Sequence, residues 1–177
     1  ASLNYDRTFF DKHAVSAMLL FNRRHYDKGE SLPYRNQGLA GRASYTYNGK
    51  YVAEFNFGYN GTENFAKGKR FGFFPAYSLG WVASEEAFFP KNKTVSFLRI
   101  RGSYGEVGND KVGGTRFLYN PSSYVYQNNT YYFGKPGSTF QPYQGSSEGV
   151  IGNPSLTWER ARKANIGADI HFWDNKI

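Results

Sequence analysis

Cysteine is absent from this chain of 177 residues. Without thiols the protein can form neither a disulfide framework nor a cysteine-based metal site. Long apolar runs are missing too, because no stretch approaches the roughly 18 consecutive apolar residues that a membrane-spanning helix needs. The first residues lack the basic and apolar regions of a secretory signal peptide. Strand-like patterning continues to both ends of the chain, which indicates a piece of a longer protein.

Catalytic constellations are also missing. The three histidines, His13, His25 and His171, stand far from one another and show no ligand-like spacing to acidic residues. Glu85 and Glu86 are adjacent, so in a strand they would face opposite ways and could not act as a carboxylate pair. We therefore expect no enzymatic activity, no metal and no cofactor.

Aromatic residues, by contrast, are abundant: the chain holds 15 Tyr and 16 Phe, and aromatics make up 19% of its residues. In residues 51–59, aromatic or small apolar side chains alternate with mostly polar ones. A strand sends successive side chains to opposite faces, so this segment predicts a sheet with one aromatic face and one polar face. A dry aromatic face opposite a wet polar one is typical of the wall of a transmembrane β-barrel.

The same alternation recurs along the chain and predicts seven antiparallel strands. Asn48-Gly49 is a strong signal for a two-residue hairpin turn between two of them. The expected strands are residues 3–9, 13–26, 38–47, 51–59, 74–84, 95–105 and 156–172.

Short and long connections alternate between these strands, so the short ones are expected at one rim and the long ones at the other. Short periplasmic turns and long extracellular loops are the sidedness of an outer-membrane barrel. The expected long loops are residues 27–37, 61–72 and 106–154, and the expected shorter connections are residues 10–12, 48–49, 85–93 and 173–176.

The positions of charged residues indicate which face of the sheet meets lipid and which meets water. Arg99 and Arg101 share one parity of their strand, while Leu98, Ile100 and Tyr104 share the other. An arginine on the lipid face near mid-membrane costs roughly 2–4 kcal/mol. A one-residue slip of register would therefore place both arginines in lipid, and the sequence specifies the aromatic face as the lipid face.

Three long segments carry distinctive motifs: residues 71–81 (FGFFPAYSLGW), residues 98–110 (LRIRGSYGEVGND) and residues 151–159 (IGNPSLTWE). They resemble, in turn, the "FFPAYSLGW" strand, the "LRGSYG.VGN" segment and the "NP.L.WE" segment of the SusC/RagA family of TonB-dependent outer-membrane transporters. Residues 4–6 and 38–42 also fit its barrel strands. The three long matches occur in the family's order, and the resemblance covers essentially the whole chain.

The resemblance implies that residues 1–177 are one partial β-barrel domain, about seven strands from the C-terminal half of a barrel of about 22 strands. The plug, the TonB box and the remaining strands of the family are absent from these residues. It further implies an outer-membrane nutrient importer of Bacteroidetes that takes up oligosaccharides or peptides. Its expected partners are outer-membrane lipid, a SusD-like surface lipoprotein, and TonB through the missing N-terminal part.

Two sets of residues are candidates for binding. In the long loop, flat aromatic rings can stack on sugars or contact a lid protein; the candidates are Tyr119, Tyr124, Tyr126, Tyr131, Tyr132 and Tyr143. On the polar face, side chains expected to point into the lumen can pair across strands, contact a plug or bind substrate; the candidates are Arg42, Glu54, Asn56, Arg99, Arg101 and Asp169, with Lys163 and Asn165 beside them.

Two rival readings remain open from the residues themselves. One is a soluble β-rich carbohydrate-binding module with an aromatic platform. The other is a nucleic-acid-binding sheet that uses the formal charge of +8, although the charges are scattered and we expect no nucleic acid. Dependence on detergent separates the barrel wall from both rivals, and steep salt dependence of binding would single out the nucleic-acid reading.

Overall fold

The computed structural model describes residues 1–27, 29, 32–90, 95–111, 116–121, 124–135, 141–149 and 151–172; of residues 124–130 and 141 it describes the backbone alone. These residues are all-β apart from one short 3₁₀ turn, η1 (Ala83–Glu85). No helix among them has the length and apolarity to cross a membrane.

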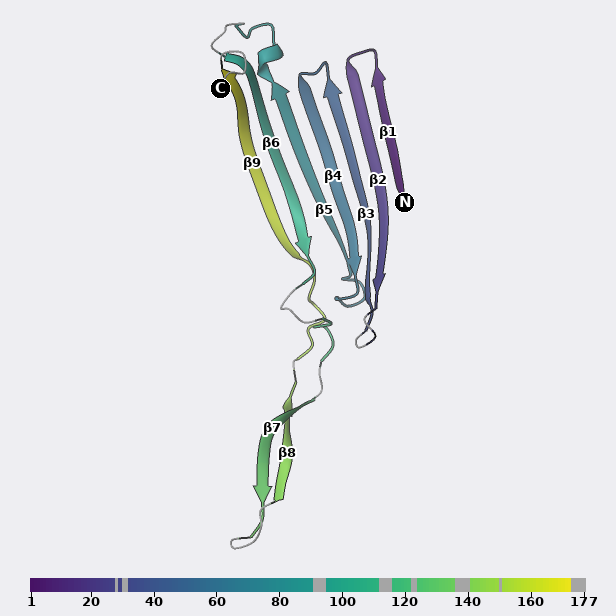
Figure 1. Ribbon diagram of the computed structural model, residues 1–177, viewed down its shortest axis with the longest axis vertical. Helices are drawn as coiled ribbons and strands as arrows, with labels where there is room; N and C mark the ends of the chain where they lie inside the picture. Colours follow the sequence, from purple (N-terminus) through teal and green to yellow (C-terminus); the bar gives the residue numbers. More distant parts are fainter. Residues whose placement is uncertain are drawn as a thin grey trace.

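Seven strands form one antiparallel sheet in a single curved layer (Figure 1). Strands β1 to β6 follow one another in chain order, and β9 pairs with β6, so β1 and β9 are the two edges. The strands are β1 (Ser2–Phe9), β2 (His13–Tyr26), β3 (Tyr34–Tyr47), β4 (Tyr51–Thr62), β5 (Phe71–Val82), β6 (Val95–Asn109) and β9 (Glu159–Phe172). The seven predicted strands and their antiparallel order are confirmed.

The strand register gathers the predicted aromatic positions on one face. Residues that pair directly across an antiparallel ladder share a face. Phe55 in the middle of β4 pairs with Ala43 of β3 and with Tyr77 of β5, and Tyr77 pairs in turn with Tyr104 of β6. The parity assigned from the sequence therefore continues across the sheet without a slip in these ladders.

The aromatic face lacks a covering layer in the described part of the chain. Tyr77 is 52% exposed, Leu79 68% and Ile166 91%. Apolar burial is concentrated instead near the two ends of the strands, at Phe65 and Phe74 on one side and at Val82 and Ala83 on the other. A soluble module would cover such a face to form its core, so the structure does not favour the carbohydrate-module reading.

The connections separate into two rims, which we name for their contents. Among the residues that the structure describes, the short-turn rim holds those of 10–12, 48–50 and 83–90, and the long-loop rim holds those within 27–33, 63–70 and 110–158 (Figure 1). Asn48 and Gly49 have φ values of 50° and 69° and are the central residues of a turn in which the Lys50 N–H donates to the Tyr47 carbonyl oxygen at 2.9 Å. Tyr47 pairs directly with Tyr51, so three residues separate the paired positions, one more than predicted. The two-rim arrangement predicted from the sequence is confirmed.

The predicted contrast in loop length is partly wrong. β3, β4 and β5 run beyond the expected boundaries into residues that were predicted as loop, so the first two connections of the long-loop rim are shorter than expected. Residues 83–94, on the short-turn rim, outnumber either of them. The residues added to β3 and β4 are mostly polar, and polar side chains do not prevent a ladder from extending into water. β5 is extended by Phe71, Gly72 and Phe73, and the first two of these pair with the lengthened end of β4.

A second sheet occupies part of the segment that was predicted to be an irregular loop. β7 (Tyr124–Phe133) and β8 (Gln141–Glu148) form an antiparallel hairpin that projects from the long-loop rim, drawn in green in Figure 1. The ladder is irregular between Tyr126 and Thr130. The high Gly, Asn, Ser and Pro content of this segment concealed the hairpin, because these residues favour turns and weaken the period-two signal.

Candidate functional site

The polar face carries the first candidate cluster at mid-height of β3 and β4. The Arg42 guanidinium donates to the Glu54 carboxylate at 2.6 Å. The Asn56 side-chain amide donates to the other oxygen of the same carboxylate at 2.7 Å. All three side chains share the face opposite the aromatic row, because Arg42 pairs with Asn56 in the ladder and Glu54 follows the same parity. The cluster joins a positive, a negative and an amide group.

A second cluster lies on the same face between β6 and β9. Asp169 sits directly opposite Arg99 in the ladder and accepts from its guanidinium at 2.8 and 2.9 Å. Arg101 reaches the other carboxylate oxygen at 3.4 Å. Lys163 and Asn165 have the same parity of β9. The structure therefore brings the predicted lumen-facing residues together as two separate charged clusters.

Both clusters keep part of their hydrogen-bonding capacity free for water or a ligand. The side chains of Arg42 and Arg101 are 54% and 63% exposed. Exposed ion pairs contribute only about 0–1 kcal/mol to stability, so stabilising the sheet does not by itself explain this concentration of charge. The polar face therefore presents hydrogen-bond donors and acceptors to any molecule that lies against it.

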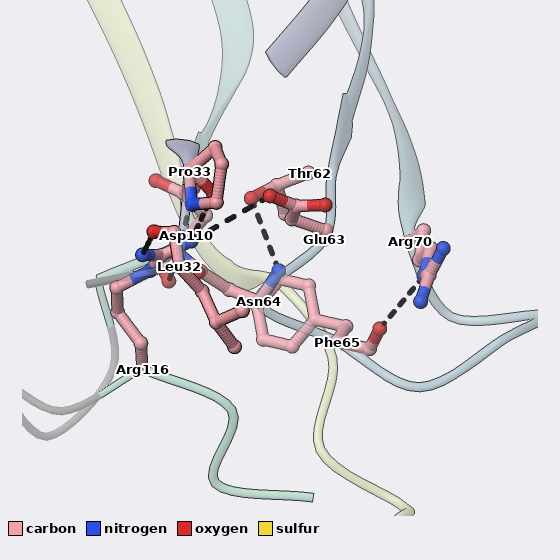
Figure 2. Close-up of polar contacts among 9 residues, drawn as sticks. All are labelled: Leu32, Pro33, Thr62, Glu63, Asn64, Phe65, Arg70, Asp110 and Arg116. Atoms are coloured by element: carbon pink, nitrogen blue, oxygen red, sulfur yellow. Dashed lines mark hydrogen bonds and ion pairs between the residues drawn. The ribbon is translucent and has the colours of Figure 1, made fainter. Parts of the chain in front are cut away.

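One arginine ties the three connections of the long-loop rim together, as Figure 2 shows. The Arg116 guanidinium donates to the carbonyl oxygens of Leu32 at 2.6 Å and Pro33 at 2.9 Å. It also lies 3.6 Å from the Glu63 carboxylate and stacks over the Tyr34 ring at 3.7 Å from the centroid. Residues far apart in the sequence thus form one assembly, in which this side chain contacts a residue of each neighbouring loop.

A hollow opens beside Arg116 on the polar side of the long-loop rim. Its volume is about 870 Å³, and amide, phenol and guanidinium groups line it. These groups hydrogen-bond to hydroxyls or peptide units, and the rings give flat apolar surface. Its lining includes Asn22, Arg24, Tyr26, Asn36, Asn64 and Arg116.

An aromatic cluster secures the base of the long connection. Trp158 packs against Phe74 and Phe65, with ring centroids 5.2 and 5.7 Å apart, and its indole nitrogen donates to the Arg70 carbonyl oxygen. A side chain at Gly108 would overlap the Phe74 ring, since an added Cβ there would clash with the ring carbons. The three sequence motifs noted above therefore meet at this one point of the fold.

The candidate tyrosines of the long segment do not form a single platform. Tyr131 pairs directly with Tyr143 across the β7–β8 ladder, so both share one face, whereas Tyr132 points to the other. All three are exposed. Tyr119 is half-buried outside the hairpin, where its ring contacts Phe117 at 6.2 Å. The side chains of Tyr124 and Tyr126 lie outside the described residues.

A carboxylate at the short-turn rim collects three donors. Glu86 accepts from the Tyr51 hydroxyl at 2.5 Å and the Trp81 indole at 3.3 Å, and Lys50 lies 3.4 Å away. Mainly because of the Tyr51 hydrogen bond, and then the Trp81 and Lys50 contacts, the pKa of the Glu86 carboxyl is lowered from its ordinary 4.5. Sequence reasoning placed this residue in a shorter connection but missed the network, since its donors come from two different strands and a turn.

No group of His, Cys, Asp or Glu among the described residues could hold a metal ion. The chemistry of the described sites is hydrogen bonding, ion pairing and ring stacking. Sequence reasoning also missed Arg116, because it lies in a Gly-rich segment without periodicity and its hydrogen-bond acceptors, the carbonyl oxygens of Leu32 and Pro33, are 84 and 83 positions away.

Two known proteins similar in sequence to this chain are both described as TonB-dependent receptors. No family model matches it. The TonB-dependent receptor SusC of Bacteroides thetaiotaomicron is 32% identical over 77% of this chain, and the TonB-dependent receptor P39 of Formosa agariphila is 26% identical over 98% of it. The chain belongs to the TonB-dependent receptors of the SusC/RagA type.

Solved structures agree on the fold of this receptor segment. The RagAB peptide transporter superposes with a TM-score of 0.75 at 17% identity over 99% of the chain, and a closed state of the RagAB peptide importer gives 0.74 at 18% over 98%. The chain spans 13% and 18% of the two curated receptors and 21% of each RagAB chain. These relatives are described as receptors and transporters, not as enzymes.

Proposed function

We propose that this chain is part of the wall of an outer-membrane, TonB-dependent nutrient importer, whose mechanism is binding and gated passage without any bond-making. The observation that carries the proposal is the continuous aromatic face: the ladders that join β3, β4, β5 and β6 keep it on one side, and nothing in the described chain covers it. The row from Tyr51 to Tyr59 rises about 26 Å at roughly 3.3 Å per residue. Its nine residues match the roughly 9–11 residues that a tilted transmembrane strand needs to cross the hydrocarbon.

The proposed cargo is an oligosaccharide or a peptide. The peptide class rests on RagAB, which is described as a peptide transporter, and the oligosaccharide class rests on the resemblance of the sequence motifs to the SusC/RagA family. The hollow beside Arg116 supports either class, because amides, phenols and guanidinium groups bind hydroxyls and peptide units alike. In this proposal the hollow is a first contact point for cargo at the extracellular mouth.

The exposed tyrosines of the β7–β8 hairpin are proposed to contact a SusD-like lipoprotein or the cargo. Tyr131, Tyr132 and Tyr143 are each more than half exposed although they lie in a two-stranded ribbon. An isolated hairpin is marginal in water, and aromatic residues are enriched where proteins meet partners. The two polar-face clusters, around Glu54 and Asp169, are proposed to face the lumen and contact a plug, with TonB coupling supplied by residues outside this chain.

The test uses the complete reading frame that carries this chain, expressed in a host whose own copy is deleted. We expect the protein to fractionate with the outer membrane and to restore growth on a glycan or a peptide mixture as sole nutrient, but only when TonB is present. A surface lipoprotein is expected to co-purify with it.

Matched variants separate the hairpin proposal from the importer proposal. Tyr131→Ser with Tyr143→Ser is expected to lower lipoprotein co-purification, while Lys67→Gln, in another loop of the same rim, leaves it unchanged. Recovery of the protein in a soluble fraction, or growth that does not depend on TonB, would refute the importer. Unchanged lipoprotein recovery in the tyrosine variant would refute the contact between the hairpin and the lipoprotein, and unchanged growth on the nutrient would refute its contact with the cargo; neither result bears on the importer itself.

A further inference from the structure

A basic hollow lies on the aromatic face of the sheet, at the long-loop rim. Its volume is about 260 Å³. His25 of β2 pairs directly with Arg35 of β3, and Arg23 lies two residues before His25, so these three side chains share one face. Phe21, two residues before Arg23, has the same parity and belongs to the aromatic row. The basic groups therefore stand on the outer side of the sheet, directly beyond its apolar part.

The positive charge of this hollow has little compensation from the protein. Arg23 and Arg35 are exposed, and neither has an ion-pair partner among the described residues. Arg70 lines the same hollow and uses its Nε to hold the Phe65 carbonyl oxygen. The one acidic lining residue, Glu63, is engaged by Arg116 at 3.6 Å. Like charges held this close repel one another unless an anion lies between them.

The height of the cluster on the sheet indicates which anion. Two residues along a strand correspond to about 7 Å. Arg23 therefore lies about 7 Å along the strand beyond Phe21, the last residue of β2 that belongs to the aromatic row. Such a site is at the level of the lipid headgroups, outside the hydrocarbon. At that level an arginine on the lipid face destabilises a barrel much less than it does at the middle of the membrane. The guanidinium fork matches the oxygens of a phosphate. Lipid molecules surround the outer face of a barrel wall and are always in contact with it, whereas a soluble anion can reach this face only from the water above the membrane.

We propose that Arg23, Arg35 and Arg70, with His25 beside them, bind the phosphate groups of an anionic lipid in the outer leaflet of the membrane around the barrel. The proposal rests on the barrel wall proposed above, because that places the aromatic face in lipid. The bound lipid would fix the height of β2 and β3 in the membrane and neutralise the cluster.

The test uses the complete reading frame that carries this chain, purified and placed in phosphatidylcholine nanodiscs with and without bisphosphorylated lipid A. The informative variant is Arg23→Gln with Arg35→Gln. The matched control is Lys67→Gln with Lys69→Gln, which removes the same charge at the same rim but from two exposed positions of the loop of residues 63–70. Heat-modifiable gel mobility verifies that each protein is folded before binding is measured.

We expect the arginine variant to bind lipid A roughly 30-fold more weakly, since each basic residue near an anionic surface contributes about 1 kcal/mol and 1.4 kcal/mol is a tenfold change. The lysine control is expected to bind as the parent does. Equal affinity of the parent and the arginine variant would overturn the proposal, as would equal losses in both variants, which would show non-specific attraction.

A competition arm separates a lipid from a free anion. Inorganic phosphate at millimolar concentration is expected not to displace lipid A from the parent protein. If inorganic phosphate displaces all of the lipid A and itself binds to the same arginines, the proposal that the ligand is a lipid is refuted. Outer-membrane fractionation and nutrient uptake are measured on the same proteins, so a receptor that imports normally but shows no preference for lipid A refutes this inference and leaves the importer intact.

Discussion

At the scale of single residues, Tyr77 and Ser78 are neighbours at mid-height of β5 but face opposite environments. Tyr77 packs against Phe55 at 5.0 Å on the aromatic face, and Ser78 pairs with Glu54 on the polar face. We predict that Tyr77→Arg destabilises the complete barrel in lipid vesicles by about 2–4 kcal/mol, measured by urea unfolding. Ser78→Arg, which introduces the same charge beside a carboxylate, should cost less than about 1 kcal/mol. Equal costs would mean that the aromatic face does not meet lipid.

Glu86 gives a residue-scale prediction that depends on pH. Because hydrogen bonds from Tyr51 and Trp81 and the charge of Lys50 lower the pKa of its carboxyl below 4.5, the ionised group stabilises the fold above that value. This contribution is lost as the pH falls through the lowered pKa. We predict that Glu86→Gln lowers the urea midpoint of the complete protein at pH 7 and that the difference shrinks below pH 4.5.

The adjacent Glu85→Gln is the control for Glu86, since it removes the same charge from outside the network of Tyr51, Trp81 and Lys50. Its urea midpoint should stay close to that of the parent at both pH values. A Glu86→Gln protein whose loss of stability is the same at pH 7 and pH 4 would contradict the assignment.

At the scale of elements, the Asn48-Gly49 turn decides how β3 meets β4. Gly49 has a φ of 69°, a region that costs a residue with a side chain about 1 kcal/mol or more. We predict that Gly49→Ala destabilises the barrel by about 1 kcal/mol in urea unfolding. Gly80→Ala is the matched control, because an added Cβ there meets only Val52 at an ordinary 3.6 Å. A larger loss at Gly80 than at Gly49 would argue against the turn geometry.

The long-loop rim gives a second element-scale prediction, centred on Arg116. Its hydrogen bonds to Leu32 and Pro33 and its contact with Glu63 hold three connections together (Figure 2). We predict that Arg116→Ala speeds amide hydrogen exchange in residues 32–36 about 30-fold, the equivalent of about 2 kcal/mol for charged hydrogen bonds. Exchange in the middle of β4 should not change.

Arg116→Lys keeps the charge but loses the planar fork, so its effect on exchange should be intermediate. Exchange in Arg116→Ala that equals the parent's would show that the three connections hold their places without this side chain.

The accuracy of the sequence-based predictions differs between elements for a physical reason. β1, β2 and β4 begin within one residue of their predicted starts because period two is strong and turn residues flank them. β3 begins four residues earlier than predicted, where its ladder continues through mostly polar residues. β5 begins three residues earlier, at Phe71, because Gly61 and Asn60 of β4 continue the ladder and Gly72 interrupts the local pattern. β7 and β8 were not predicted, because turn-forming residues obscure the alternation of apolar and polar side chains in them. Each also depends on pairing with the other strand, which the local pattern does not reveal.

At the scale of the whole molecule, the sheet ends in two unpaired strands, β1 and β9 (Figure 1). Unpaired backbone groups and an uncovered apolar face favour association with other chains. We predict that residues 1–177 expressed alone aggregate in buffer without detergent, whereas the complete reading frame is monodisperse in detergent. Light scattering and circular dichroism check this. A folded, monodisperse preparation of the fragment without detergent would contradict the open barrel wall.

The sequence by itself determined which side chains share a face, because period two and the cost of charge in lipid act on each strand separately. Only the tertiary structure decided what meets across long separations: β6 with β9, Trp158 with Phe74, and Arg116 with Leu32. Those contacts depend on loop closure and on the complementarity of distant surfaces. No local pattern encodes either of them, so they became visible only once the seven strands lay side by side.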